Sequence, residues 1–401
     1  MDLTQFFRLM AEKRASDLFF SAGAPVCIKI EGEIRPVNQQ VFDAAMVKRV
    51  AYALMTEEQI RTFEAKWEMN FGLSVPNCGR FRVNVFRQRG SVAMVIRYIT
   101  DQVPSIDSLG LPPVLKDLVM QKRGLILVVG ATGSGKSTTL AAMIDHRNTH
   151  ATSHILAIED PIEFIHRHKR SIVNQREVGI DTESYASALV NALREAPDVL
   201  LIGEIRDQET MRQALIYTQT GHLCLATLHA NNAYHALNRI IGLFPAETHE
   251  GLLLDLATSL KAVISQRLVK GVDGKRVAAL EILINNLHIA ELIQRREIDK
   301  IKEAIEQSLV EGAQTFEESL LELYVNGRIS REEALANADS RTNMEWLIAN
   351  SNKYRELRAQ RARQVMIDED KVREDSQQDL PGLLSAEDLD KLGVARMPSS
   401  R

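Results

Sequence analysis

The stretch Gly124–Leu140, GLILVVGATGSGKSTTL, decides how the rest of the chain is interpreted. Its apolar run Leu125–Val129 has the length and the β-branched content of a fully buried strand. The strand ends at Gly130, where a G-x-x-x-x-G-K-S pattern typical of a phosphate-binding loop begins. The helix expected from Ser137 to Asp145 would bring the positive end of its dipole to the same point. A chance glycine-rich turn is the alternative, and the flanking strand and helix count against it.

The residues of this loop suit a nucleotide for separate chemical reasons. Glycines let the backbone wrap closely around an anion and point N–H groups at it. Lys136 supplies a positive charge for the β- and γ-phosphates, and the Ser137 hydroxyl suits a Mg2+ ligand position. We therefore expect ATP and Mg2+ as cofactors. The predicted ATP-binding residues are Gly130, Ala131, Thr132, Gly133, Ser134, Gly135, Lys136, Ser137 and Thr138.

Length and composition are those of a globular protein of more than one domain. The chain has 401 residues, enough for two domains and a tail, and a formal charge of −4 gives no overall attraction to nucleic acid or anionic lipid. Cys27, Cys78 and Cys224 are far apart and form no CxxC, which argues against a zinc site or a disulfide framework. No apolar run could span a bilayer or serve as a signal peptide. These features predict a cytoplasmic location.

Composition and periodicity divide the chain into four parts. Residues 1–100 mix helix patterns with strand-like pieces and are predicted to form a small α/β domain. Residues 101–122 contain three prolines and are interpreted as a linker. Residues 123–350 alternate strands and helices, as a mostly parallel α/β sheet requires, and end in helices. Residues 351–401 have roughly balanced charges and few aliphatic side chains, which predicts a disordered tail.

The strands expected in the third part surround the phosphate-binding loop. They are predicted at Leu125–Val129, His154–Ile158, Val199–Ile202 and Cys224–Thr227. From residue 246 to about 350 the pattern is mainly helical, with a short strand pair around Gly271–Leu283. Asp273-Gly274 is the expected hairpin turn of that pair.

Acidic residues follow two of these strands, and hydrolysis needs such groups. A second carboxylate on the metal side and a group that orients water must accompany the phosphate-binding loop. Glu204 follows the strand Val199–Ile202, at the sheet end where α/β folds present ligands, and could hold Mg2+ through water. Glu159, Asp160 and Glu163 follow another strand, and three acids on one loop repel each other without a positive partner. One of them is a natural base, and position alone does not say which.

Two further segments contain polar residues that could serve the same site. Thr227 and His229 end the strand Cys224–Thr227 and could reach a γ-phosphate or its water, whereas His222 precedes that strand. The strand Gly79–Gln88 alternates apolar residues with arginines, so a solvated outer face is the default. A nucleic-acid platform, or arginines that reach a nucleotide of a neighbouring subunit, are the alternatives.

Four of these segments resemble the nucleotide boxes of secretion-type ATPases. GATGSGKSTT, AIEDPIEF, LIGEIRD and TGHLCLATLHANNA are similar, in order and spacing, to the Walker A, Asp, Walker B and His boxes. The opening MDLTQFFRLMAEKRASDLFFSAGAPVCIKIEGEI and the later GRFRVNVF resemble the start of the PilT/PilU family of type IV pilus retraction motors. The resemblance reaches about residue 345 and includes LFPAE, ISQRLV and NGRISREEAL.

The resemblance implies a fold, an assembly and roles for single residues. It implies a PAS-like domain over residues 1–100, a RecA-like ATPase core, a homohexameric ring and ATP at the seam between subunits. It makes Glu163 the catalytic glutamate and Glu204 the Walker B carboxylate. For sensing the nucleotide it implies arginines of the N-terminal domain, and Arg80, Arg82 and Arg97 lie in the matching stretches. The other candidates for this role are Arg194 and Arg206, which flank the core boxes, and Thr227, His222 and His229.

One stretch departs from the family pattern. PilT-type motors have an AIRNL-like motif where this chain reads NLHIAELIQRREI, and the arginine and asparagine are absent from His288–Leu292. Together with the extended tail, this resembles the accessory PilU branch. The resemblance implies a motor for pilus retraction in twitching motility that works with a PilT-type motor and an inner-membrane platform protein, at the inner-membrane face, without nucleic acid. The alternatives are a structural or regulatory ring subunit with little ATPase activity of its own, and a nucleic-acid translocase.

Overall fold

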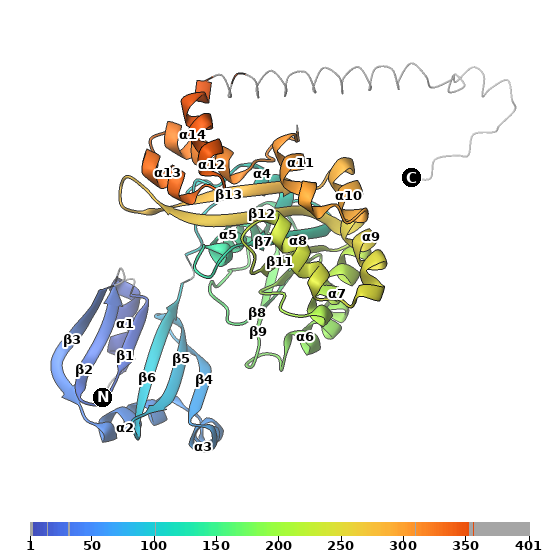
Figure 1. The fold of residues 1–401 in the computed structure, drawn as a ribbon. Coiled ribbons are helices and arrows are strands. Elements are labelled where there is room, and N and C mark those ends of the chain that lie inside the picture. Colours follow the sequence, from blue (N-terminus) through green and yellow to red (C-terminus); the bar gives the residue numbers. More distant parts are fainter. Residues whose placement is uncertain are drawn as a thin grey trace, which may run out of the picture.

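The computed structural model describes residues 3–13, 15–30, 33–100, 102–308, 310–352 and 356. These residues form two α/β units, each built on its own sheet (Figure 1). The N-terminal unit covers residues 3–100, and the second unit covers residues 102–352. The predicted disordered tail lies outside the described residues except for residues 351, 352 and 356.

The N-terminal unit, drawn in blue in Figure 1, is an antiparallel sheet with helices packed against it. Its six strands lie in the order β3-β2-β1-β6-β5-β4. The strands are β1 (Asp17–Phe20), β2 (Ala24–Ile30), β3 (Glu33–Phe42), β4 (Glu68–Val75), β5 (Gly79–Gln88) and β6 (Ser91–Ile99), and the helices are α1 (Thr4–Lys13), α2 (Ala44–Leu54) and α3 (Glu57–Lys66). The alternation predicted for β5 is confirmed, since Phe81, Val83 and Val85 are fully buried.

The segment expected as a linker belongs in large part to the core of the second unit. Helix α4 (Val114–Val119) follows the proline-rich stretch. Ile106, Leu111 and Leu115 are buried in the same cluster as strands of the second sheet. This segment is therefore part of the second unit. The chain passes from one unit to the other near Thr100.

The second unit is built on a seven-stranded sheet in the order β13-β12-β7-β11-β10-β8-β9. Its strands are β7 (Gly124–Val129), β8 (His154–Glu159), β9 (Ile172–Glu177), β10 (Val199–Ile202), β11 (Leu223–Leu228), β12 (Leu260–Lys270) and β13 (Arg276–Ile284). Neighbouring strands are parallel except for β12 and β13, which are antiparallel. The four predicted strands are confirmed, whereas β9 was not predicted.

Helices cover both faces of this sheet. They are α5 (Lys136–His150), α6 (Tyr185–Ala192), α7 (Gln208–Gln219), α8 (Ala233–Gly242), α9 (His249–Ser259), α10 (Leu287–Gln294), α11 (Ile301–Glu306), α12 (Phe316–Val325), α13 (Arg331–Asn337) and α14 (Arg341–Ala349). Short 3-10 turns lie at Leu193–Glu195, Ala246–Thr248 and Ile298–Lys300. None of the described helices is both long enough and apolar enough to cross a membrane.

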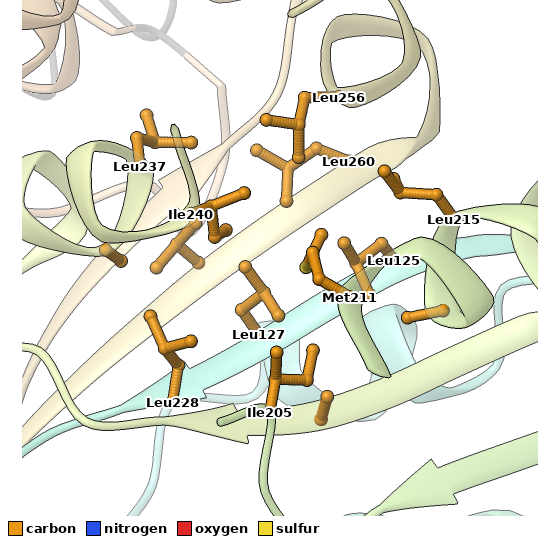
Figure 2. Close-up of a cluster of buried hydrophobic side chains, with 14 of the residues drawn as sticks. Leu125, Leu127, Ile205, Met211, Leu215, Leu228, Leu237, Ile240, Leu256 and Leu260 are labelled. Carbon is orange, nitrogen blue, oxygen red and sulfur yellow. The ribbon is translucent and has the colours of Figure 1, made fainter. Parts of the chain in front are cut away.

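The core of the second unit fixes the strand that leads into the phosphate-binding loop. All six residues of β7 are buried, as are those of β11 beside it. Figure 2 shows Leu125 and Leu127 of β7 packed among side chains from α7, α8 and α9, including Met211 and Leu237. Burial of apolar surface on this scale holds the strand rigidly, so the loop after Val129 starts from a fixed point.

The strand pair predicted near Gly271–Leu283 is longer than expected. β12 and β13 stay in register from Ala262 opposite Ile284 to Lys270 opposite Arg276, around the predicted turn, where Gly274 has φ +77°. β12 also pairs in parallel with β7, so the hairpin extends the central sheet. The sequence pattern predicts helix over Leu260–Lys270, whereas the structure has a strand there, because a strand buried on both faces shows no alternation in sequence.

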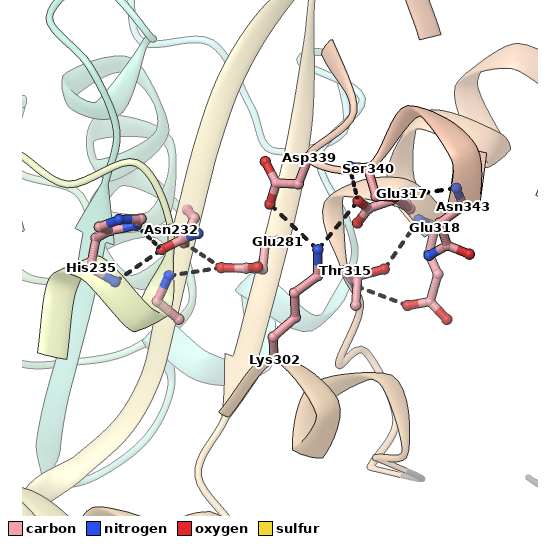
Figure 3. Close-up of polar contacts among 12 residues, drawn as sticks. Asn232, His235, Glu281, Lys302, Thr315, Glu317, Glu318, Asp339, Ser340 and Asn343 are labelled. Atoms are coloured by element: carbon pink, nitrogen blue, oxygen red, sulfur yellow. Dashed lines mark hydrogen bonds and ion pairs between the residues drawn. The ribbon is translucent and has the colours of Figure 1, made fainter. Parts of the chain in front are cut away.

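Buried carboxylates make polar contacts between the hairpin and α8 and between two of the last helices (Figure 3). Glu281 of β13 accepts hydrogen bonds from the Ala233 N–H at the start of α8 (2.8 Å) and from the Ser265 hydroxyl (3.0 Å). Glu317 of α12 lies 3.4 Å from the ammonium of Lys302 on α11. Burial raises the pKa of Glu281, and the two donated hydrogen bonds oppose that effect. These contacts tie α8 to the hairpin and α11 to α12.

Candidate functional site

A cavity of about 220 Å³ lies where the carboxyl ends of the central strands meet the start of α5. Lys136 and Ser137 reach it from the first turn of α5, and Glu163 from the loop after β8. Glu204 follows β10 and His229 follows β11, and both line the same cavity. The sequence predicted that these groups would meet, because parallel strands bring their carboxyl ends to one edge of a sheet.

The phosphate-binding loop has a backbone that requires glycine. Gly133 and Gly135 have φ of +78° and +87°, a region that other residues rarely adopt. At Gly130 a Cβ atom would lie 2.4 Å from the Ser134 hydroxyl oxygen and 2.5 Å from the carbonyl oxygen of Gln266. No side chain fits there without a shift of the loop or of β12. The tight conformation of the loop thus depends on its glycines.

Lys136 lies folded against this loop. Its Nζ donates hydrogen bonds to the carbonyl oxygens of Gly130 (3.0 Å) and Ala131 (2.9 Å). Burial lowers the pKa of Lys136, and the carboxylates of Glu204 and Glu163 oppose that effect. The ammonium therefore shares its cavity with two carboxylates that both act on it electrostatically. Such an arrangement is suited to an anion with its metal ion.

Glu204 is held between two basic side chains. Its Oε2 accepts a hydrogen bond from Arg206 Nε at 2.8 Å, and its Oε1 lies 3.2 Å from His229 Nε2. The Thr227 hydroxyl donates to the carbonyl oxygen of Gly203, the residue before Glu204. Glu204, Arg206, Thr227 and His229, four of the predicted site residues, are thus brought together. The carboxylate is fixed in place by its neighbours while it faces the cavity.

The three acids after β8 have different surroundings. Burial raises the pKa of Glu159 to about 7, although Gln175 Nε2 donates a hydrogen bond to its Oε1 at 3.0 Å. Asp160 lies 3.5 Å from Nη1 of Arg206. Glu163 is exposed and lines the cavity. The alternatives left open by the sequence are therefore no longer equivalent, because Glu163 is the acid least occupied by contacts within the chain.

Known proteins that are similar to this chain include ATPases, which agrees with a nucleotide site in this cavity. A family model described as "Type II/IV secretion system protein" matches residues 2–372. The chain belongs to this family of ATPases. It is 48% identical over 349 residues to the type IV pilus ATPase PilU of Pseudomonas aeruginosa, covering 87% of this chain and 91% of PilU. It is 43% identical over 334 residues to the retraction ATPase PilT of the same organism, covering 83% of this chain and 97% of PilT.

The fold of this secretion ATPase is also that of a solved relative. A crystal structure of the pilus retraction motor PilT with bound ADP matches with a TM-score of 0.80 and 40% identity, over 86% of this chain and 99% of that one. The α/β fold, the ATPase activity and the resemblance to the PilT/PilU family are confirmed. The PAS-like character of the N-terminal unit stays a prediction.

Several predicted site residues of the secretion ATPase lie away from the cavity. Arg97 of β6 donates from Nε to Asp17 Oδ1 at 2.8 Å, and Arg194 donates to Asn191 Oδ1 at 3.1 Å. His222 lies at the opposite end of β11, with its Nδ1 3.0 Å from the Thr220 hydroxyl. Among the described residues the cavity lining includes none of Arg80, Arg82, Arg97, Arg194 and His222. Their role in sensing a nucleotide stays a prediction.

A residue that the sequence reasoning missed holds the phosphate-binding loop from behind. Gln266 of β12 is buried; its Oε1 accepts from the Thr139 hydroxyl (2.7 Å) and its Nε2 donates to the Ser134 carbonyl oxygen (2.8 Å). The signal that could have found it is a polar pair, Ser265 and Gln266, inside an apolar run. Buried polar side chains need partners, and here the partner is the loop.

Proposed function

We propose that this secretion ATPase is a motor for type IV pilus retraction that acts as an accessory, PilU-like ATPase with a PilT-type partner. The convergence of Lys136, Glu163 and Glu204 in one cavity carries the proposal. The similarity to PilU and PilT supports the mechanical role. ATP hydrolysis in this cavity would drive the two units past each other and so move a partner.

The cavity suits the phosphate end of ATP. Its volume of about 220 Å³ is below the roughly 300–1,000 Å³ of pockets that enclose a whole small-molecule ligand. We therefore place the triphosphate on residues 130–138, with Lys136 against the β- and γ-phosphates. The base and ribose would lie toward a neighbouring surface. A homohexameric ring with ATP near the subunit seam would provide that surface.

The donor atoms of the cavity suit Mg2+. The Ser137 hydroxyl and the Glu204 carboxylate are the hard oxygen donors that Mg2+ prefers. The residues described by the structure include no group of three acidic, histidine or cysteine side chains that could hold a metal alone. Mg2+ takes few protein ligands and completes its shell with phosphate oxygens and water. We propose that Ser137 and, through water, Glu204 hold the ion, which would neutralise charge on the phosphates.

We propose that Glu163 orients the attacking water and accepts its proton. Glu159 and Asp160 also line the cavity, but Glu159 accepts a hydrogen bond from Gln175 Nε2 and Asp160 lies 3.5 Å from Arg206, so neither carboxyl group is as free to bind water as that of Glu163. Arg206, Thr227 and His229 would hold Glu204 in place beside the γ-phosphate. Arg80, Arg82, Arg97, Arg194 and His222 would sense the nucleotide only after the units or subunits rearrange.

The accessory role rests on one helix. The stretch that departs from the AIRNL-like motif lies on α10, where Leu287, His288 and Glu291 are exposed. Because this exposed surface differs from the AIRNL-like motif of PilT-type motors, it suits a motor that relies on a PilT-type partner and on the inner-membrane platform protein. Such a motor would act at the cytoplasmic face of the pilus machine. A regulatory ring subunit with little ATPase activity is the second candidate, favoured by this helix alone.

ATP turnover of the purified chain, alone and with a PilT-type partner, tests the proposal. We expect measurable turnover alone and a rise above the sum of the two proteins when both are present. The control is Lys136→Met of this chain mixed with the same partner, because the turnover that remains in this mixture is the partner's own. Absence of both ATP binding and turnover, with and without the partner, would overturn the proposal.

A further inference from the structure

The loop that contains Glu163 is held by a side chain from the neighbouring strand. Gln175 lies on β9, the edge strand that pairs in parallel with β8. Its Nε2 donates hydrogen bonds to the Phe164 carbonyl oxygen (2.8 Å) and to Glu159 Oε1 (3.0 Å). Its Oε1 accepts a hydrogen bond from the His166 N–H at 2.9 Å. The amide of Gln175 thus contacts the loop at three points, before and after Glu163 in the sequence.

The side-chain amide of Gln175 takes the place of a backbone peptide. In a parallel sheet, a residue bonds to the carbonyl oxygen of one residue on the next strand and to the N–H of the residue two positions further on. Gln175 makes this pair of bonds with Phe164 and His166 through its side chain. Its three hydrogen bonds use both N–H groups and the oxygen of the amide. Neither an apolar side chain nor a carboxylate offers the same set of groups.

The other edge of the same segment is also hydrogen-bonded. The Ile165 N–H donates to the Thr100 carbonyl oxygen at 3.1 Å, and Phe164 forms a parallel bridge with Thr100. The backbone directly after Glu163 is therefore fixed on both edges. Because a single side chain, that of Gln175, supplies one of these edges, a single substitution can remove it.

The segment that Gln175 holds is part of the cavity wall. Glu163, Phe164 and His166 all line the cavity, whereas Gln175 is not among the described residues that line it. Gln175 therefore contacts the wall from behind. The exact position of the wall matters for catalysis, because a displacement of about 1 Å in a reacting group can lower a rate by about a hundredfold.

We propose that Gln175 is a positioning residue for hydrolysis, which holds the backbone that carries Glu163 at the cavity. Its amide fixes the end of β8 before Glu163 and the residues directly after it. The carboxylate of Glu163 is thereby kept at one place relative to the phosphate-binding loop. The proposal rests on the proposed function, in which Glu163 orients the attacking water. It gives the edge strand a role in the reaction without any contact between Gln175 and ATP.

ATP turnover by the full chain tests this role through Gln175→Met, which keeps about the same side-chain size and removes the three hydrogen bonds. We expect kcat to fall about tenfold and KM to change by less than about twofold. The control is Gln219→Met on α7, which removes a 2.7 Å hydrogen bond from a glutamine amide to Asp255 and should leave kcat within about twofold of the wild type. An unchanged kcat in Gln175→Met, a loss that appears mainly in KM, or an equal loss in Gln219→Met would overturn the proposal.

A combination with Glu163→Gln separates positioning from a general loss of structure. In single turnovers with the enzyme in excess, adding Gln175→Met should slow Glu163→Gln by less than about twofold, because the group that Gln175 positions is already lost. A further slowing of about tenfold would overturn the proposal, since Gln175 would then act independently of Glu163.

Hydrogen exchange without nucleotide gives a readout that needs no activity. Gln175→Met should accelerate exchange in residues 163–168, where the His166 N–H loses its acceptor, while exchange in β8 and β9 stays as in the wild type. No acceleration in these residues, or acceleration throughout both strands, would overturn the proposal. If the wild type failed to hydrolyse ATP, the proposed function would fail, and this experiment would still decide whether Gln175 holds the loop.

Discussion

At the scale of single residues, nucleotide affinity depends most directly on Lys136. Its ammonium lies within 3.0 Å of two loop carbonyl oxygens, so it is placed at the loop before a phosphate arrives. We expect Lys136→Met to weaken ATP binding by at least about 30-fold, or roughly 2 kcal/mol, in an equilibrium titration. Lys116→Met removes an ammonium of the Asp107 surface pair and is the control. An equal loss of affinity in both variants would contradict this role.

Glu159 links stability to pH. Burial raises its pKa from 4.5 to about 7, so between these values the folded protein holds a proton that the unfolded chain has released. Its contribution to the free energy of unfolding therefore falls as the pH rises through this range, by at most about 3 kcal/mol. Glu159→Gln should be more stable than the wild type in urea denaturation at pH 8 and equally stable at pH 4.

The control for this prediction is Glu163→Gln. Because Glu163 is exposed, its substitution should change the free energy of unfolding by less than about 0.5 kcal/mol at either pH. The account of Glu159 would be wrong if Glu159→Gln were no more stable than the wild type at pH 8. Both variants are measured without nucleotide, since phosphate and metal would change the charge of the cavity.

Single residues of the site could be predicted where the chemistry is local. Lys136, Ser137 and Glu204 follow from the loop pattern and from strand ends, and the structure places all three at one cavity. Gln266 could not be found in this way. The Ser134 carbonyl oxygen that Gln266 contacts lies 132 residues away in the sequence. Residues that only the fold brings together have no characteristic spacing in the sequence.

At the scale of elements, β12 acts as a support for the phosphate-binding loop. Gln266→Leu would leave the Thr139 hydroxyl and the Ser134 carbonyl oxygen without their partner. We expect the free energy of unfolding to fall by about 1–3 kcal/mol and ATP binding to weaken, as measured by denaturation and titration. Adding Thr139→Val should recover part of the stability, because it removes a buried unpaired hydroxyl. ATP affinity equal to that of the wild type would contradict the supporting role.

Elements were predictable where their pattern has a clear period or a clear end. β7, β8, β10 and β11 are apolar runs that each end in glycine or polar residues, and they were found. β9 was missed because its sequence, IVNQRE, is mostly polar, as suits a strand at the edge of the sheet. β3 was missed for the same reason, since eight of its ten residues are exposed.

At the scale of the whole molecule, charge argues against nucleic acid as the moving partner. The formal charge is −4, and polyanions bind through clusters of basic residues that release counterions. We expect single- or double-stranded DNA to change ATP turnover by less than about twofold at moderate salt. Stimulation that disappears as the salt concentration rises would favour a translocase instead.

The arrangement of the two units was the part least accessible from sequence. Composition predicted two domains, whereas the packing of Ile106, Leu111 and Leu115 into the core of the second unit depends on contacts that leave no pattern in the sequence. The resemblance to retraction motors supplied the expectation of a ring, which the sequence patterns alone would not give.

The most direct test of the central claim is ATP turnover by Glu163→Gln, with ATP affinity measured on the same preparation. Glu163 lines the cavity and is exposed, so its loss should leave the phosphate-binding loop intact. The account predicts turnover at least about 100-fold below the wild type and affinity within about threefold of it. Turnover close to that of the wild type would contradict the account and direct the search for the base to Glu159 or Asp160.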